Sequence, residues 1–383
     1  MVSRKALALL LVAALVLGLT STALAAGQNP DPGKKEDYKF PDWAEAAWAF
    51  RHMARMKFMN VMRGYEDGNF KPNGAISQAE ALVMVIRMRD AEAAAAALSN
   101  TTTLVIPGVN RMWAWGYIKY AVDNNWISLD DFNPNRAASR LWVAALLVKA
   151  FGEASATAPQ LTAALVAFSD ISQLADADKG FIAVAFAKGW ILGYPDGTFK
   201  PNKPVTRAEM AALLDRGEGI LPKAYQAASV KGLVMSTSST GMPVVRTITV
   251  LKDGETATTS YTLADNALIV GKGYAEVAFT DIDALDYVRI LLDSAGKAAV
   301  ITVEDKKVIE LTGTATAKVA ATTTTPATIT LRYGGTSGTF NVAADAVLKK
   351  ADGTPATLTD VSGLVVVKIK DNVIIELQIK PVP

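Results

Sequence analysis

The sequence contains no cysteine and only one histidine, His52, among its 383 residues. Without cysteine the chain cannot form a disulfide framework or a thiolate metal site, and it has no thiol nucleophile. One histidine cannot make a histidine metal cage or a catalytic triad on its own. Because His52 falls in a helical stretch rich in alanine and methionine, we expect it to have a structural or surface role.

The chain also lacks an excess of either charge. It has 39 basic and 37 acidic residues, and the formal charge of +2 comes from Arg4 and Lys5 near the N-terminus. A neutral, evenly mixed surface offers no field to a polyanion. We therefore expect no nucleic-acid partner, and any anion must be bound by a few placed groups.

Long apolar runs are scarce, and the longest covers residues 6–19. It follows Arg4 and Lys5 and is succeeded by small residues at 23–26, which is the pattern of a secretory signal peptide cleaved near Ala26. The run is shorter than the roughly 20 residues that span a bilayer. We expect an exported mature chain without a transmembrane segment.

The sequence pattern changes between residues 217 and 228. Before this stretch, apolar residues recur at spacings of three and four, which predicts helices. After it, Thr, Val and Ile alternate with polar residues, and Asp-Gly and Gly-Gly turns separate the runs, which predicts strands. Strands are expected within residues 247–251, 288–292, 299–304, 328–333 and 365–369.

The β half repeats itself at offsets of 79 to 81 positions. Residues 248–250 correspond to residues 329–331. The Ala-Asp-Asn-Ala sequence at 264–267 corresponds to Ala-Ala-Asp-Ala at 343–346. Two units of about 75 residues with five or six short strands each predict two small barrels or sandwiches. The threonine-rich tract at 320–325 should lie at an exposed turn.

The helical half contains a longer repeated motif. Residues 64–80 read GYEDGNFKPNGAISQAE, and residues 193–209 read GYPDGTFKPNKPVTRAE. A third, shorter copy includes Phe132 to Asn135 and Ser139-Arg140, and it lacks the Gly-Tyr-x-Asp-Gly turn. Three helical units therefore fill this half.

The resulting division of the chain is as follows: signal peptide 1–26, linker 27–39, helical repeats 40–90, 91–152 and 153–216, linker 217–228, and β modules 229–306 and 307–383.

Much of the repeated motif has a purely structural explanation. Asp-Gly supplies a turn with glycine at positive φ. Ser77 with Glu80, and Thr206 with Glu209, have the spacing of a helix capping box. The sequence therefore predicts that these residues begin helices.

Arg207 and Arg140, which follow two of the caps, need a different explanation. A cation at the first helical position meets the positive end of the helix dipole, which is mildly unfavourable. One interpretation is that the arginine and the helix N-terminus bind an anionic ligand together. The alternative is a salt bridge to a neighbouring acid such as Asp170 or Glu209.

The tryptophans also allow two interpretations. Trp48 and Trp113 lie near the start of a unit's first helix, where an indole can stack on a sugar ring or pack between repeats. Trp126 and Trp190 precede the turn, and we expect them to be core residues.

The helical units resemble S-layer homology repeats. The resemblance rests on Phe168-Ser169-Asp170, on the Gly-Tyr-x-Asp-Gly-x-Phe-x-Pro motif at 193–201, and on Thr206-Arg207-Ala208-Glu209. It covers about 175 residues, is strongest in the third copy and weakest in the second, and does not extend to the β half.

This resemblance implies an all-α pseudo-threefold spindle whose inter-repeat grooves bind secondary cell-wall polysaccharide on peptidoglycan, often through a pyruvate-ketal sugar. Together with the export signal and the neutral charge, it leads us to expect a non-catalytic S-layer or cell-wall surface protein whose β modules serve S-layer assembly or surface display. Its further partners would be itself or other S-layer proteins, and we expect no cofactor. The ligand-binding residues implied or suggested are Arg207, Arg140, Lys200, Lys71, Thr206, Ser139, Gly193, Tyr194, Gly64, Tyr65, Trp48, Trp113, Asp42 and Asp170.

The sequence departs from the family pattern in each repeat. Gln78 stands where the first repeat should have arginine, Asn133 replaces a basic residue in the second, and Leu141-Trp142 replaces Ala-Glu there. The third has Ala177-Asp178 where Trp-Ala is expected. We therefore expect unequal grooves, with those that use Arg207 and Arg140 as the functional ones.

Two alternatives concern the β half. It could hold a wall-displayed carbohydrate-binding or enzymatic region, although it has no histidine and little room for a substrate cleft. Asp281, Asp283 and Asp286 could bind calcium, but their spacing is also that of a loop between strands.

Overall fold

The structure is a computed structural model of the chain and describes residues 39–100, 113–217, 229–255, 257–304, 308–370 and 373–381. The predicted signal peptide lies outside the described residues. The described chain divides into two compact units, one holding residues 56–217 and the other holding residues 39–55 together with the β-rich part. No described helix has both the length and the apolar composition needed to cross a membrane.

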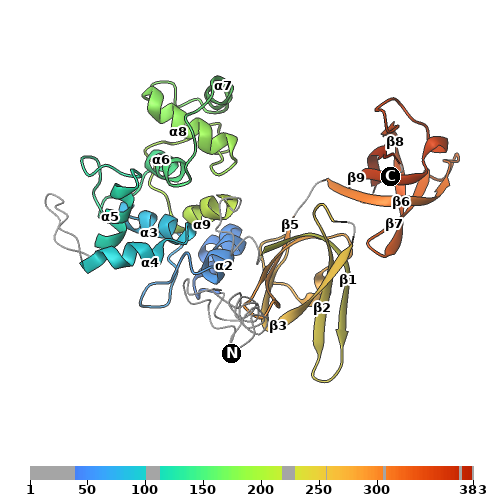
Figure 1. Ribbon diagram of the computed structural model, residues 1–383, viewed down its shortest axis with the longest axis horizontal. Helices are drawn as coiled ribbons and strands as arrows, with labels where there is room; N and C mark the ends of the chain where they lie inside the picture. The colour runs from blue at the N-terminus through green and yellow to red at the C-terminus, as the bar shows by residue number, and fades with distance from the viewer. Residues whose placement is uncertain are drawn as a thin grey trace, which may run out of the picture. The chain divides into compact units, whose positions relative to one another are not determined.

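The helical part (blue to yellow-green in Figure 1) contains the following elements: η2 (Trp43–Ala49), α2 (Phe50–Phe58), α3 (Gln78–Met88), α4 (Glu92–Ala97), η3 (Leu98–Asn100), α5 (Trp115–Asp123), α6 (Arg140–Ala150), α7 (Ala158–Ala167), α8 (Asp176–Ala187) and α9 (Arg207–Arg216). The predicted core tryptophans Trp126 and Trp190 are buried, and so is His52 in α2.

A closed ring of backbone hydrogen bonds joins the three copies of the repeated motif. Ile76 N donates to Val205 O at 3.0 Å, Val205 N to Ala138 O at 2.9 Å, and Ala138 N to Ile76 O at 2.8 Å. Each copy thus donates one bond and accepts another. The middle copy therefore occupies a position in the ring equivalent to that of the other two copies. This confirms the expected threefold arrangement.

Each motif helix also begins on the backbone of another copy. The first helical amides of α3, α6 and α9, at Gln78, Arg140 and Arg207, donate to the carbonyl oxygens of Arg136, Lys203 and Gly74 at 2.8 to 3.0 Å. Helix N-termini leave amides without intrahelical partners, so these bonds satisfy donors that would otherwise need water or a ligand. The three helices consequently lie together in the helical part (Figure 1).

The predicted capping boxes are present. Ser77 Oγ accepts from Glu80 N at 3.2 Å while Glu80 Oε2 accepts from Ser77 N at 2.8 Å. Thr206 and Glu209 repeat this pair at the start of α9. Gly68 and Gly197 have φ of 78° and 72°, as the turn prediction requires.

The β-rich part contains β1 (Ser229–Thr240), β2 (Val245–Lys252), β3 (Thr258–Val270), η5 (Phe279–Asp281), β4 (Tyr287–Leu292), β5 (Ala298–Glu304), β6 (Ile309–Val319), β7 (Thr328–Tyr333), β8 (Thr336–Lys349), η6 (Leu358–Asp360), β9 (Gly363–Lys370) and β10 (Val373–Ile379).

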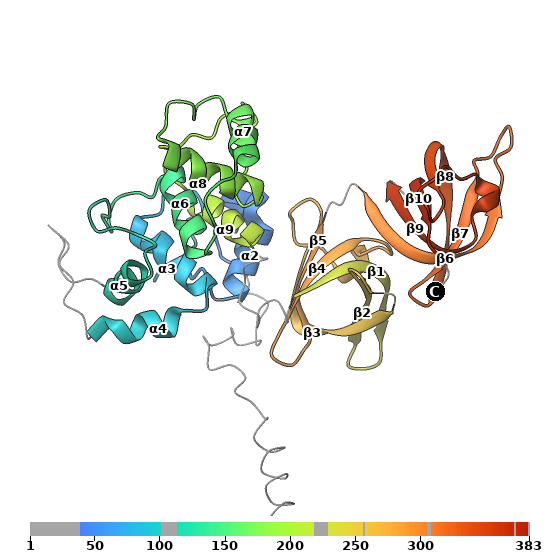
Figure 2. The same cartoon turned by 45° about the horizontal axis from the view of Figure 1, so that its top comes forward.

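These strands form two closed five-stranded barrels with the same topology. The order is β1-β2-β3-β5-β4 in the first and β6-β7-β8-β10-β9 in the second, and the first strand pairs with the fourth in each (Figure 2). One pair per barrel, β3 with β5 and β8 with β10, is parallel. The expected repeat of barrels is confirmed, and all five predicted strand segments fall within strands.

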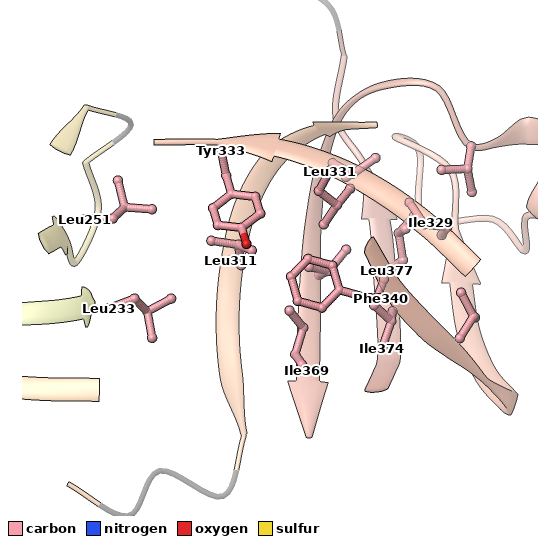
Figure 3. Packing of buried hydrophobic residues seen from close by; sticks show 14 of the residues in the cluster. Leu233, Leu251, Leu311, Ile329, Leu331, Tyr333, Phe340, Ile369, Ile374 and Leu377 are labelled. Carbon is pink, nitrogen blue, oxygen red and sulfur yellow. The ribbon is translucent and has the colours of Figure 1, made fainter. Parts of the chain in front are cut away.

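The second barrel is filled by a cluster of apolar side chains that includes Leu331, Phe340, Ile369 and Leu377 (Figure 3). Alternation along the strands produces this core, because every second residue faces inward. The threonine-rich tract at 320–325 is exposed between β6 and β7, as expected.

Candidate functional site

The motif arginine of the third repeat is buried and spans two repeats. Arg207 is 3% exposed, and its guanidinium donates from Nε to Phe70 O at 2.6 Å and from Nη2 to Arg63 O at 2.7 Å. Its Nη1 also lies 3.7 Å from Glu80 Oε1. This cation at the start of a helix thus donates hydrogen bonds to two backbone carbonyls of the first repeat.

Arg140 does the same between the second and third repeats. Its Nε donates to Phe199 O at 2.8 Å and its Nη2 to Leu192 O at 2.9 Å. Gln78, at the matching position of the first repeat, instead accepts from Asn133 N at 2.9 Å through its side-chain oxygen. All three side chains thus tie the start of a motif helix to the loop of another repeat.

The two motif tyrosines each lie against cations. Arg207 and Lys71 both lie 4.5 Å from the ring of Tyr65, and Arg140 and Lys200 lie at 4.6 and 4.3 Å from the ring of Tyr194. Such cation–π contacts are favourable when partly desolvated. The contacts hold the rings between charged side chains.

Each tyrosine hydroxyl also donates to the capping glutamate of its own repeat. Tyr65 binds Glu80 at 2.8 Å and Tyr194 binds Glu209 at 2.9 Å. Burial raises the pKa of Tyr65, and the hydrogen bond to Glu80 adds to the increase, while Arg207 opposes it. The tyrosine therefore stays a neutral donor at physiological pH.

A first groove of about 270 Å³ opens beside this arrangement. Its lining residues are Arg63, Gly64, Tyr65, Glu80, Val83, Met84, Arg87, Trp113 and Arg207. It brings together four residues that the sequence suggested for ligand binding: Gly64, Tyr65, Trp113 and Arg207. Trp113 is 61% exposed, so its indole is accessible at the groove.

The first groove has a net positive charge. Arg63 and Arg87 both bind Glu92, at 2.8 and 3.0 Å. Even when Glu92 is counted with Glu80, the three arginines leave one positive charge in excess. An anionic ligand is therefore favoured there over a cationic one.

Lys203 makes the third repeat different from the first. Its Nζ donates to Tyr194 Oη and Glu209 Oε1, both at 2.8 Å, whereas the matching position in the first repeat is Gly74. Burial would raise the pKa of Glu209, but the bonds from Lys203, the Thr206 amide and Tyr194 outweigh it and lower the pKa. The carboxylate of the third repeat is thus fully engaged.

A second groove of about 530 Å³ lies at the second repeat. Its lining includes Gln78, Trp126, Ser128, Asp131, Arg136, Ser139, Trp142, Lys149, Asp178 and Asn202. Of the suggested binding residues it contains only Ser139, which caps α6 by accepting from Trp142 N at 3.3 Å. The sequence did not suggest the larger groove, although it did show Trp142 in the place of glutamate.

Other suggested residues shape the turns. Lys71 and Lys200 have positive φ and pair with Asp67 and Asp196 at 3.0 and 2.8 Å. Asp170 accepts from the amides of Phe199 and Lys200, both at 2.8 Å. Asp170 thus binds the Phe-x-Pro loop to the start of the same repeat.

Gly193, Asp42 and Trp48 complete the set. A Cβ on Gly193 would come within 2.4 Å of Phe168 Cε1, so glycine is needed for close packing there. Asp42 precedes η2 and Trp48 lies within it, 46% exposed. Both belong to the other compact unit, so neither is assigned to a groove.

Two of the three aspartates considered for calcium, Asp281 and Asp286, accept hydrogen bonds within their own loop. Asp281 Oδ2 accepts from Ala278 N at 2.9 Å, Asp286 Oδ2 accepts from Asp283 N at 2.9 Å, and Lys272 binds Asp286. Within the described ranges, no group of three or more acidic or histidine side chains is arranged to hold a metal ion.

Comparison with known proteins agrees with the threefold helical part. The S-layer homology domain family matches residues 39–82 and 167–211, which belong to the first and third repeats. The middle repeat falls outside the matched residues, but the backbone ring places it with the other two.

Several relatives are surface or anchoring proteins. The chain is 31% identical over 158 residues to the cellulosome-anchoring protein of Acetivibrio thermocellus, covering 40% of this chain and 34% of that protein. It is 28% identical over 165 residues to the surface-layer 125 kDa protein of Lysinibacillus sphaericus, covering 41% and 13%. An endoglucanase of a Bacillus species is 23% identical over 215 residues, covering 55% and 22%.

The fold and these similarities together define the class. The chain contains S-layer homology repeats, in a helical region that is followed by a β-rich C-terminal region. It spans about a third or less of the length of these relatives.

Proposed function

We propose that this protein is a non-catalytic surface protein anchored to secondary cell-wall polysaccharide by the grooves of its S-layer homology region. The observation that carries the proposal is the first groove, where an exposed Trp113 faces a net positive set of arginines around Tyr65 and Glu80. An acidic sugar that carries a pyruvate ketal fits this groove, because an indole can stack on its ring and a positive field attracts its carboxylate.

In this proposal the buried arginines act indirectly. Arg207 and Arg140 hold neighbouring repeats together through carbonyl bonds, and Arg207 also contributes its charge to the first groove. Direct contact with the ligand is assigned to the accessible Trp113 and to the polar groups beside it. The two barrels are proposed to project from the anchor for S-layer assembly or surface display.

The proposal is tested by sedimentation of the full chain with purified cell-wall sacculi. Trp113→Ala should reduce the bound fraction, because it removes an exposed side chain that packs only partly on the protein. Val166→Ala, an exposed apolar residue on α7 outside the grooves, is the matched control and should bind like the native chain. Equal binding by all three proteins would reject the role of the first groove.

A further inference from the structure

The first and second grooves occupy equivalent places in their repeats but differ in chemistry. In the first groove, Tyr65 binds Glu80 and fills the space beside Arg207. The second repeat lacks the tyrosine turn, and Trp142 stands at the position of Glu80. The groove left there is about 530 Å³ rather than about 270 Å³, within the usual range of ligand pockets.

An aromatic wall replaces the tyrosine–glutamate pair. Trp142 is half-buried in the groove lining, and its ring lies 6.3 Å from that of Phe132 with a 34° interplanar angle. Phe132 therefore supports the indole from the protein side. Phe181 of α8 also lines the groove and is covered by Lys149 Nζ at 5.2 Å from its ring centre.

Charge in the second groove is balanced. The lining contains Arg136 and Lys149 against Asp131 and Asp178. Gln78 brings no charge, and its oxygen is already bound to Asn133 N. Arg136 donates to the carbonyl oxygen of Asp131, which directs part of its guanidinium into the turn.

The two carboxylates remain available as acceptors. Within the part of the chain that the structure describes, neither Asp131 nor Asp178 forms an ion pair. Carboxylates accept hydrogen bonds and repel anions, so they suit sugar hydroxyls and disfavour an acidic substituent. Asn202, from the third repeat, adds an amide that can both donate and accept.

We propose that the second groove binds an uncharged segment of oligosaccharide. One face of a sugar ring stacks on Trp142, and sugar hydroxyls donate hydrogen bonds to Asp131 and Asp178. This inference rests on the proposed wall-anchoring function and makes the anchor bivalent for two kinds of sugar, one acidic and one neutral. Two linked sites raise the overall affinity beyond that of either site without any new contact.

The test uses the full chain and two probes: wall polysaccharide carrying its ketal-linked pyruvate, and the same polysaccharide after mild-acid removal of the pyruvate. Trp142→Ala removes the indole on which the sugar is proposed to stack. Ala145→Trp fills the groove from a lining position on α6. Trp113→Ala, in the first groove, is the matched control. Circular dichroism confirms that each variant is folded before titration.

Trp142→Ala and Ala145→Trp are expected to lower the affinity for the pyruvate-free polymer about tenfold and to keep binding of the pyruvylated polymer through the first groove. Trp113→Ala should do the opposite. If the native chain binds only the pyruvylated polymer, or if both folded second-groove variants bind the pyruvate-free polymer like the native chain, the inference is overturned and the anchor stands. If the native chain binds neither polymer, the proposed anchoring function fails with it.

Discussion

The Nε of Arg207 donates to the carbonyl oxygen of Phe70 at 2.6 Å and so joins the third S-layer homology repeat to the first across 137 positions of sequence. Arg140 makes the equivalent bond to Phe199 O between the second and third repeats. A motif residue that looks like a ligand group in the sequence therefore has a defined structural role in the ring of repeats.

Arg207→Ala should destabilise the helical region strongly. The change removes two hydrogen bonds from a charged donor and leaves two carbonyls without it, at a cost of about 3 to 5 kcal/mol. Arg140→Ala should have a similar effect. Thermal unfolding followed by circular dichroism measures this cost.

Lys188→Ala is the control for the arginine variants, because Lys188 is an exposed partner of Glu153 at 2.7 Å. Exposed pairs contribute roughly 0 to 1 kcal/mol. If Arg207→Ala unfolded no earlier than Lys188→Ala, the carbonyl bonds would not be holding the repeats together.

Asp170→Ala should loosen the Phe-x-Pro loop of the third repeat. Its carboxylate holds the amides of Phe199 and Lys200, and losing two charge-assisted bonds should cost roughly 2 to 4 kcal/mol. Hydrogen exchange of those two amides should accelerate, whereas Asp176→Ala, which alters a fully exposed side chain, should leave them protected. If the two amides exchanged at the same rate in Asp170→Ala as in the native chain, the Asp170 carboxylate would not be holding this loop.

Acid should weaken the third repeat through Glu209. Its pKa is lowered in the folded chain, since Lys203, Tyr194 and the Thr206 amide outweigh the effect of burial. A lowered folded-state pKa stabilises the protein above the unfolded-state pKa, and this contribution disappears as pH falls through the folded-state value. Urea unfolding between pH 7 and pH 3 should show a smaller loss in Glu209→Gln than in the native chain. Parallel curves for the two proteins would exclude the linkage.

Phe340→Ala should destabilise the second barrel by about 3 to 5 kcal/mol, because it empties part of a closed core. Val347→Ala, at a half-exposed position of β8, should change the unfolding midpoint little. Urea denaturation followed by far-ultraviolet circular dichroism distinguishes the two. Equal midpoints would show that the cluster in Figure 3 is not the core that holds this barrel.

Local features of this protein could be predicted from sequence because their causes are local. Thr206 and Glu209 lie three positions apart, and such spacing determines a capping box. Alternation predicted strands such as β7 for the same reason. The 79- to 81-residue offset predicted that the two barrels repeat.

The role of the arginines could not be predicted because their partners are distant. The carbonyls that accept hydrogen bonds from Arg207 belong to Phe70 and Arg63, which lie 137 and 144 positions away in the sequence. Every residue has a backbone carbonyl, so the sequence does not indicate which ones bind the arginine. The larger second groove was missed for a related reason. A deleted tyrosine turn looks like degeneration in sequence, whereas in the structure it leaves a space walled by Trp142.

The central claim, anchoring to wall polymer, is tested most directly by sedimenting the full native chain with sacculi that retain their secondary polysaccharide and with sacculi from which it has been stripped by hydrofluoric acid. The account predicts that the protein pellets with the first and stays in the supernatant with the second, and that free polysaccharide releases it. Equal pelleting with both kinds of sacculi, or with neither, would contradict it.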